Sequence, residues 1–398
     1  MRAITFQDVR DVVVQEISDP EVRDPTDVVV RVQLAAICGS DLHPYLGRET
    51  GLDVGTVMGH EFLGEVVAAG SAVEQLRVGD RVVSPFTTSC GACFYCASGL
   101  TARCVHGELF GWVADGRGLH GGQAELVRVP FADATLVRVP AAARDEEALL
   151  AGDVLSTGFF CARLGNIEPG QAVAVVGAGP VGICAAIAAR ELGAGQVFSL
   201  DLEPARLALA GSYGAQPVLA SDGDALAQLH DMTAGRGVDV ALECVGSEAA
   251  TRSAFALVRP GGTIAAAGVH CEPHFAFSPA DAYDKNLTYR AGRCSAQAMP
   301  AAHSSLSRSS AVRFTLRKTS AGEGFVSSGI TAATKGGIGC PLVMRSFVRP
   351  WGAFSSSSSD STPFSVVHVG GVISVNLRSD LGSKTTGIAL VSCPIKLK

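Results

Sequence analysis

The sequence contains few charged and few aromatic residues. Charged side chains make up 18% of the chain and aromatic ones 6%, whereas 47% of the residues are hydrophobic. So apolar a composition excludes an intrinsically disordered or fibrous protein and indicates a sizeable buried core. With 398 residues, the chain is long enough for roughly two or three domains.

Long hydrophobic runs and an export signal are also missing from the sequence. No apolar run approaches the ~20 residues that a membrane-spanning helix needs. The N-terminus leads directly into alternating, strand-like residues rather than into a secretory signal. We therefore expect a cytoplasmic protein without a membrane partner. In a reducing compartment, its 12 cysteines are expected to be metal ligands or buried apolar residues rather than disulfides.

Lysine is almost missing from most of the chain, and its distribution marks a break in composition. Lys285 is the only lysine before residue 298, and residues 1–297 carry 21 Lys and Arg against 35 Asp and Glu, a net charge of −14. Residues 298–398 carry 11 Lys and Arg against 3 Asp and Glu, a net charge of +8, and hold 20 serines against 14 in the first 297 residues. The acidic main part argues against a nucleic acid partner.

The hydrophobic pattern predicts two kinds of domain. In about the first hundred residues, β-branched runs such as Val28–Val32 and Glu65–Ala69 are bounded by Gly, Pro and Asp, which indicates a small β barrel or sandwich. From about Ala141 on, short apolar strands alternate with helical stretches, which is typical of βαβ units around a parallel sheet. The predicted elements of this part are a helix at Glu146–Ala151, strands at Ala172–Val176, Gln196–Leu200, Val238–Cys244 and Thr263–Ala267, and helices at Val181–Leu192, Ala225–Met232 and Ala249–Val258.

Four of the cysteines lie close together in the sequence. Cys90, Cys93, Cys96 and Cys104 have the spacing C-x2-C-x2-C-x7-C, and four thiolates this close can form a tetrahedral cage around a soft divalent ion. Because all four candidate ligands are sulfur, no coordination position stays open for a substrate. We therefore predict a structural zinc site, with an iron–sulfur cluster as the alternative.

A second set of metal-ligand residues precedes this cluster. Cys38 and His60 supply one thiolate and one imidazole, the mixed set that zinc prefers, although each residue alone is more often a buried thiol or a core histidine. A catalytic zinc site needs a third protein ligand and one open position. Seven other histidines have no partner at ligand spacing, and we expect no functional role for them: His106, His120, His230, His270, His274, His303 and His368.

A glycine-rich turn follows the first predicted strand of the α/β part. Gly177, Gly179 and Gly182 form G-x-G-x-x-G at the start of a predicted helix, and Asp201 ends the next strand. In such a motif the glycines allow a tight turn, close approach of a pyrophosphate to the helix N-terminus, and close helix packing. Asp201 would bind the adenosine ribose hydroxyls and repel a 2′-phosphate, which favours NAD over NADP, although Arg206 keeps NADP open. A buried glycine turn without a ligand is the alternative.

These features together resemble a known family. The segment Gly59–Val73 contains G-H-E-x2-G-x5-G-x2-V, which is similar to the zinc signature of the medium-chain alcohol dehydrogenases. Gly121–Glu125 and Tyr289–Cys294 resemble the formaldehyde-dehydrogenase-like branch of that family. The resemblance covers residues 1–295 and implies an α/β protein. A GroES-like zinc-binding catalytic domain at 1–150 would precede a Rossmann NAD-binding domain, with a doubly wound parallel sheet, at 151–295.

The resemblance implies a set of ligands for a catalytic zinc. Cys38 and His60 would be two of them, and Asp153 would be the third, in the segment just before the nucleotide-binding domain. The family often has Cys at this place, and its formaldehyde-dehydrogenase-like branch has Asp. A thiolate and a carboxylate together neutralise Zn²⁺. A helix cap is the alternative role for Asp153.

The resemblance also implies roles for residues near these ligands. Ser40 and His43 fit the family's hydroxyl-to-imidazole relay, which carries the proton of the alcohol to solvent. Asp41 resembles the carboxylate that orients the imidazole of His60, and Glu61 resembles the carboxylate behind the zinc. For Asp41 and Glu61, a solvated surface position is the alternative.

We therefore expect a zinc-dependent oxidoreductase that transfers a hydride between an alcohol, or a hydroxymethyl adduct, and NAD. It would hold one catalytic and one structural zinc, and the family resemblance implies a homodimer or homotetramer, which the C-terminal segment makes doubtful. A polyol or amino-alcohol dehydrogenase of the same family is one alternative. A non-catalytic, metal-stabilised, NAD-binding relic disabled by its tail is another.

Residues 296–398 do not match the family. The elements that would finish the nucleotide-binding sheet and form the subunit contact are not recognisable in this Ser-rich segment, so we expect an incomplete Rossmann domain. Its composition is typical of translation in a shifted reading frame. An additional domain and a basic interaction arm are the alternatives.

Overall fold

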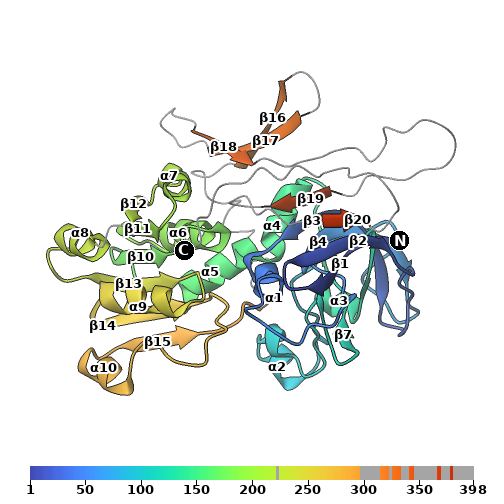
Figure 1. Cartoon of the computed structure of the whole chain (residues 1–398), viewed down its shortest axis with the longest axis horizontal. Coiled ribbons are helices and arrows are strands. Elements are labelled where there is room, and N and C mark those ends of the chain that lie inside the picture. The colour runs from blue at the N-terminus through green and yellow to red at the C-terminus, as the bar shows by residue number, and fades with distance from the viewer. Residues whose placement is uncertain are drawn as a thin grey trace. The chain divides into compact units, whose positions relative to one another are not determined.

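The structure, a computed structural model, describes residues 1–220 and 224–295 and, beyond them, only the backbone of a few short strands (Figure 1). The interpretations of residues 296–398, including the shifted reading frame, therefore concern a segment outside the described residues. The described residues form two compact units, Met1–Gly152 and Asp153–Ser295. The strands placed by backbone alone are β16 (Phe314–Ala321), β17 (Phe325–Ala332), β18 (Cys340–Met344), β19 (Ser365–His368) and β20 (Leu377–Ser379).

The first unit is built mainly from antiparallel strands. β3 (Val28–Ile37) pairs with both β4 (Glu61–Ala69) and β8 (Leu126–Val129), so β3 is central in this sheet. β4 pairs in turn with β5 (Arg81–Val83), and β5 pairs with β9 (Val137–Arg138). The remaining elements are the strands β1 (Arg2–Asp8), β2 (Asp11–Glu16), β6 (Trp112–Ala114) and β7 (Arg117–Leu119), and the helices η1 (Gly39–Asp41), α1 (Leu42–Tyr45), α2 (Phe94–Ala97), η2 (Thr101–Arg103), α3 (Ala132–Thr135) and α4 (Asp145–Gly152).

The alternation of side chains along β3 and β4 fills the core of this unit. Val28, Val30 and Val66 are fully buried, and they pack in one cluster with Phe62 and Phe110. The rings of Phe62 and Phe110 meet edge to face, with centroids 5.1 Å apart, an arrangement that aromatic quadrupoles favour. The predicted β domain is thus held by an apolar centre to which β3 and β4 contribute most directly.

The second unit is a parallel sheet covered by helices. Its six strands lie in the order β12-β11-β10-β13-β14-β15, which is the doubly wound order 3-2-1-4-5-6 of dinucleotide-binding sheets. The strands are β10 (Ala172–Val176), β11 (Gln196–Asp201), β12 (Gln216–Leu219), β13 (Val238–Glu243), β14 (Val258–Ala266) and β15 (Thr288–Ala291). The helices are α5 (Val154–Leu164), α6 (Pro180–Glu191), α7 (Pro204–Ser212), α8 (Ala225–Met232), α9 (Glu248–Leu257) and α10 (Pro279–Asp284).

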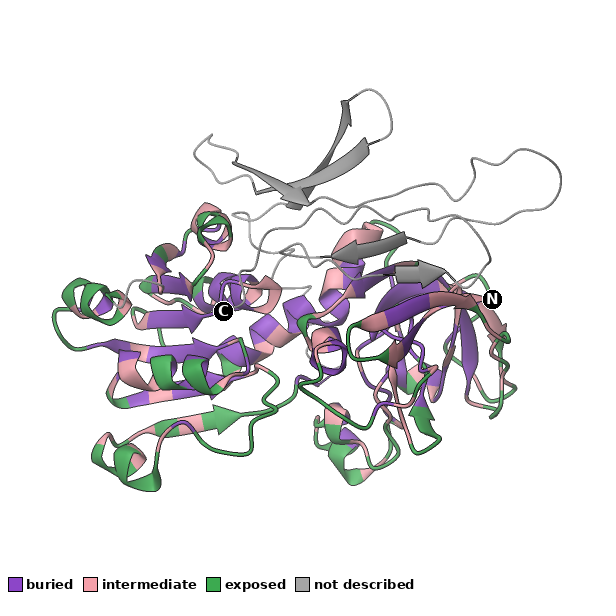
Figure 2. Ribbon diagram, in the orientation of Figure 1, coloured by how far each residue is buried: buried purple, intermediate pink, exposed green. Residues whose placement is uncertain are grey.

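The expected alternation of strands and helices is confirmed, with one correction at the end of the sheet. We expected the sheet to lack its final strands, and this was wrong because β15 completes the doubly wound order beside β14. Its residues, Thr-Tyr-Arg-Ala, are mostly exposed (Figure 2). An edge strand of this kind has no buried apolar run, so hydrophobic periodicity could not reveal it. Within the described residues, no helix is long and apolar enough to cross a membrane.

We predict that Phe62→Ala lowers the free energy of unfolding of the first unit by about 3–5 kcal/mol, because it removes a fully buried ring and leaves a cavity. Urea denaturation followed by tryptophan fluorescence measures the change. Tyr283→Ala, at a side chain that is 82% exposed, serves as the control and should shift stability by less than about 0.5 kcal/mol. An unchanged midpoint for Phe62→Ala would contradict its place in the core.

Candidate metal centres and cofactor site

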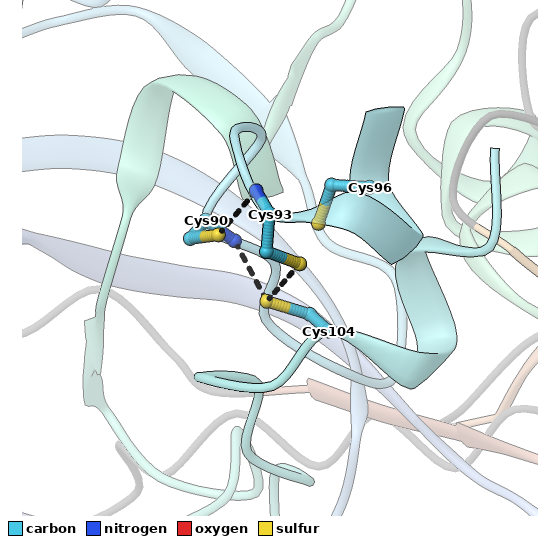
Figure 3. Close-up of side chains that lie close together, drawn as sticks. All are labelled: Cys90, Cys93, Cys96 and Cys104. Carbon is cyan, nitrogen blue, oxygen red and sulfur yellow. Dashed lines mark hydrogen bonds between the residues drawn. The ribbon is translucent and has the colours of Figure 1, made fainter. Parts of the chain in front are cut away.

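The four cysteines predicted to hold a structural metal lie together in the first unit. Their sulfur atoms are all within 4.8 Å of one another, and Sγ of Cys93 lies 3.8 Å from Sγ of Cys104 (Figure 3). Four sulfurs bound tetrahedrally to one zinc at about 2.3 Å are about 3.8 Å apart. The cluster therefore has the dimensions of a closed four-thiolate zinc site.

Local backbone structure brings these cysteines together. Cys93 is the N-cap residue of α2 and Cys96 lies inside that helix, while Cys104 follows η2. Gly91 and Gly99 adopt φ angles of +74° and +81°, which glycine tolerates without steric cost and which let the chain turn back on itself. The backbone N–H groups of Cys90 and Cys93 donate to the sulfurs of Cys104 and Cys90, at 3.2 and 3.4 Å.

The thiols of the cluster differ in acidity. Hydrogen bonds from the backbone N–H groups of Cys96 and Val105 lower the pKa of Cys93 to about 6. Burial, together with the neighbouring thiols, raises the pKa of Cys96 to about 12. Several thiolates in contact repel one another, so full ionisation of the cluster requires a cation, and a divalent metal supplies that charge.

Pairing of β3 with β4 creates the second candidate metal site. Ala36 at the end of β3 pairs with Glu61 at the start of β4, so the residues just after β3 lie beside those just before β4. This pairing brings Cys38 close to His60 and Glu61, although about twenty residues separate them along the chain. His60 and Glu61 are buried, with 7% and 2% of their surfaces exposed.

Asp153 joins this group at the junction between α4 and α5. Helix α4 packs against β3, β4 and β5, and its last residue, Gly152, lies so close to β5 that a Cβ atom there would be 2.7 Å from the Ser84 carbonyl. Ligand atoms of Cys38, His60, Glu61 and Asp153 all lie within 4.8 Å of one another.

The side chain of Asp153 does not act as the helix cap that was the alternative to a zinc ligand. Asp153 stands at the N-cap of α5, but its side chain makes no capping hydrogen bond to the helix backbone. Instead, the hydroxyl of Thr157 donates to Oδ1 of Asp153 at 2.8 Å. This contact fixes one carboxylate oxygen of Asp153 in place.

Asp41 links the backbone of Cys38 to the ring of His60. Oδ2 of Asp41 accepts the Cys38 N–H at 2.8 Å, and Oδ1 lies 3.1 Å from His60 Nδ1. The amide of Gln123 also reaches Oδ2 at 3.4 Å and donates to the Ala36 carbonyl at 3.2 Å. A carboxylate on Nδ1 fixes the tautomer that presents Nε2 as a metal ligand.

Charge balance tests whether a metal fits this second group. A thiol, an imidazole and two buried carboxylates share a small volume, and like charges in such surroundings are costly unless a cation compensates them. Zn²⁺ accepts sulfur, nitrogen and oxygen ligands of this kind. The donor set therefore fits a zinc ion, and its mixed character is typical of catalytic rather than structural sites.

Ser40 and His43 lie on the short helices that follow Cys38. Ser40, in η1, has its Oγ 3.2 Å from Nε2 of His60, so the hydroxyl is within hydrogen-bond reach of the group. His43, in α1, is 8% exposed, and its backbone carbonyl accepts the Arg48 N–H at 2.8 Å. The structure thus places both residues of the expected relay on one short helical segment after β3.

The glycine turn of the second unit has the backbone geometry that a pyrophosphate site needs. Gly177 has a φ angle of +97°, and a Cβ on Gly182 would lie 1.8 Å from the Gly177 carbonyl oxygen. No described atom lies within 4 Å of where a Cβ on Gly179 would be. Gly179 is the N-cap residue of α6, so the open space lies at a helix N-terminus, where anions bind.

Asp201 lies at the end of β11, beside this turn. Its Oδ2 accepts the Ala178 N–H at 2.7 Å and its Oδ1 accepts the Glu203 N–H at 3.0 Å. Nη1 of Arg206 lies 3.7 Å from Oδ2. Asp201 is thereby fixed beside the turn, with the guanidinium of Arg206 near its carboxylate.

Sequence reasoning did not find two residues that contact the second metal-ligand group, nor a contact of His270 in the second unit. Gln123 lies in a segment noted only for its resemblance to the family, and Thr157 is one turn of helix beyond Asp153. His270 was expected to have no functional role, yet its Nε2 lies 3.0 Å from a carboxylate oxygen of Glu243. Spacing along the chain could not show this contact, because it joins the ends of two different strands.

Comparisons with known proteins show the family of this chain. Residues 24–141 match the family described as alcohol dehydrogenase GroES-like domain, and residues 180–308 match zinc-binding dehydrogenase. A medium-chain reductase/dehydrogenase of Acremonium sp. is 43% identical over 292 residues, covering 71% of this chain and 98% of that protein. Zinc-type alcohol dehydrogenase B of Aspergillus flavus is 43% identical over 304 residues, covering 74% and 69%.

A solved structure shows the same fold. Alcohol dehydrogenase from Thermus sp. ATN1 superposes with a TM-score of 0.71 at 40% identity, covering 76% of this chain and 87% of that one. The chain therefore belongs to the zinc-dependent medium-chain alcohol dehydrogenases, oxidoreductases that transfer a hydride between a small alcohol or aldehyde substrate and NAD.

Proposed function

We propose that this chain reversibly oxidises an alcohol or hydroxymethyl adduct at a zinc ion held by Cys38, His60 and Asp153. The observation that carries the proposal is the convergence of these ligand atoms with Glu61 inside 4.8 Å, beside an Asp41 carboxylate that contacts His60. A carboxylate as third ligand supports the formaldehyde-dehydrogenase-like branch of the family. A zinc ion in this position would lower the pKa of a bound alcohol.

The protein's own residues would then handle the proton. As the hydride leaves the carbon of the alcohol for the nicotinamide, the hydroxyl proton has to leave a buried site. Ser40 is the hydroxyl within hydrogen-bond reach of the ligand group, and His43 follows on the same segment with an imidazole, the side chain that commonly transfers protons in enzymes. We assign Ser40 to accepting and passing this proton and His43 to releasing it.

Two carboxylates support the zinc ligands in this proposal. Asp41 would orient the imidazole of His60, because it contacts Nδ1 and so makes Nε2 the ring nitrogen that would bind the metal. Glu61 adds a second carboxylate, besides that of Asp153, within reach of the same ion, and it is buried. We assign Asp41 to positioning the imidazole of His60. We assign Glu61 to the carboxylate behind the zinc, which could exchange with a water molecule bound to the metal.

The cofactor proposal rests on the second unit. Gly177, Gly179 and Gly182 would hold the pyrophosphate of NAD at the N-terminus of α6. Asp201 would bind the adenosine ribose hydroxyls, with Arg206 beside it, and its negative charge would repel the additional phosphate of NADP.

We also propose the following organisation. Residues 1–150 form the zinc-binding catalytic domain and residues 151–295 the NAD-binding domain. We expect the homodimer or homotetramer that the family resemblance implies, and light scattering would measure the mass of the assembly. A cytoplasmic location fits a four-thiolate metal site, which requires reduced cysteines.

An alcohol panel separates this proposal from the two alternatives. Turnover of simple alcohols or hydroxymethyl adducts with NAD supports it, and a preference for polyols or amino alcohols would assign the chain to another branch. A protein that binds zinc and NADH but turns over none of these substrates would be the relic.

We predict a zinc content of two per chain, because the described residues contain two separate ligand groups. Cys93→Ser should retain one zinc and destabilise the protein, since a structural zinc contributes directly to folding. Elemental analysis of the purified protein measures the content. The exposed Cys271→Ser should keep both metals. Retention of both by Cys93→Ser would contradict the four-cysteine assignment.

Asp41→Asn is expected to weaken catalytic-zinc affinity by about 10- to 100-fold, the usual effect of losing a carboxylate behind a metal-bound histidine. Competition with a chelator of known affinity measures it. The structural zinc gives an internal control, because its four ligands lie in another segment and should keep their metal. Equal loss of both metals would point to a general loss of structure instead.

Asp201→Ala should weaken NADH binding and reduce the discrimination against NADPH, because the charge that repels the 2′-phosphate is removed. Fluorescence titration with each reduced cofactor measures both affinities. The exposed Asp284→Ala serves as a matched control. If the unmodified protein already prefers NADPH, the assignment of Asp201 is wrong.

A further inference from the structure

Glu243, at the end of β13, is a buried carboxylate that the proposed function does not use. Its side chain is 0% exposed. Its Oε1 accepts the backbone N–H groups of Val245 and Gly246, at 2.8 and 2.7 Å, and its Oε2 lies 3.0 Å from Nε2 of His270. A fully buried carboxylate is tolerated because three donors satisfy it.

Glu243 also forms hydrogen bonds with the segment that follows β14. The backbone carbonyl of Glu243 accepts the N–H groups of Ala267 and Gly268, at 3.0 and 3.3 Å. His270 therefore adds a side-chain link to a segment that Glu243 already holds through its backbone. The other ring nitrogen of His270, Nδ1, lies 3.8 Å from Glu272. The imidazole is thus placed between two carboxylates, one buried and one partly exposed.

These loops lie beside the glycine turn of the cofactor site. A Cβ on Gly177 would be 2.5 Å from Cγ2 of Val245, and a Cβ on Gly268 would be 2.1 Å from the Gly246 nitrogen. The loops after β10, β13 and β14 are therefore in contact at the carboxyl ends of their strands. In the strand order of this sheet, the crevice between β10 and β13 is the switch point at which ligands bind.

The position of Asp201 determines which half of a dinucleotide these loops face. Asp201 ends β11, on one side of β10, and would hold the adenosine half. The pyrophosphate would lie at Gly179, after β10. A dinucleotide extended across the switch point then places its nicotinamide half on the other side of β10, over the ends of β13 and β14. This is the side on which Glu243 and His270 join the loops.

We propose that His270, through its contact with buried Glu243, is a positioning residue for the nicotinamide half of the cofactor. The pair holds the segment after β14 in the conformation that accepts this half. The inference rests on the cofactor site proposed above. Without the His270 link, the segment spends less time in the binding-competent conformation, and the apparent affinity falls in proportion to that fraction.

The experiment is fluorescence titration of the full-length, zinc-loaded protein with NADH, alongside calorimetric titration with AMP, which carries only the adenosine half. His270→Ala should weaken NADH binding about tenfold, the scale of one hydrogen bond to a charged group, and leave AMP affinity unchanged. His270→Gln retains an N–H donor toward Glu243 and should recover most of the NADH affinity. The exposed His274→Ala, in the same segment, should bind both ligands as the unmodified protein does.

Three results would overturn the inference. The first is unchanged NADH affinity in His270→Ala. The second is an equal loss of NADH and AMP affinity, or a lowered melting temperature, because either indicates general damage to the domain rather than positioning of one half of the cofactor. The third is an unmodified protein that binds no NADH, which rejects the proposed cofactor site itself and with it this role of His270.

Discussion

The antiparallel pairing of β3 with β4 is the constraint on which the candidate catalytic site depends. Because Ala36 pairs with Glu61, the residues just after one strand and just before the other must meet. Every ligand or supporting residue between Cys38 and Glu61 takes its place from that register. A shift of one residue would turn each strand's side chains to the opposite face, so the packing of Phe62 in the core and the direction of its neighbours Glu61 and His60 are determined together.

The candidate cofactor site depends in a similar way on the strand order of the parallel sheet. The parallel order puts the carboxyl ends of β10, β11, β13 and β14 at one edge, and glycine at positions 177, 246 and 268 lets the loops there approach one another closely. Glu243 then joins two of these loops through both its side chain and its carbonyl. The order of the strands thus determines where the candidate cofactor site lies, and hydrogen bonds from a few residues determine the conformation of the loops around it.

Much of this arrangement could be predicted from the sequence. The four cysteines and the glycine motif are local patterns, because residues close together in the sequence form each site. The strands of the α/β part could be predicted from their short apolar runs. The six-stranded sheet was underestimated because β15 has polar, exposed side chains. Contacts between distant segments were not foreseen. Gln123 reaches Asp41 across 82 positions, and His270 reaches Glu243 across 27, and neither separation leaves a periodic trace in the sequence.

The two candidate metal sites differ in how far apart their ligands lie along the chain. The four cysteines fall within one short stretch, Cys90–Cys104, so closing that loop costs little conformational entropy, and the metal can organise it early in folding. The other group takes Cys38 from just after β3, His60 and Glu61 from the beginning of β4, and Asp153 from between α4 and α5. Closing such long segments costs more entropy and has to wait for the strands and helix to dock. The candidate catalytic centre is therefore expected to assemble late, and its occupancy by metal would report that the segments carrying these ligands have come together.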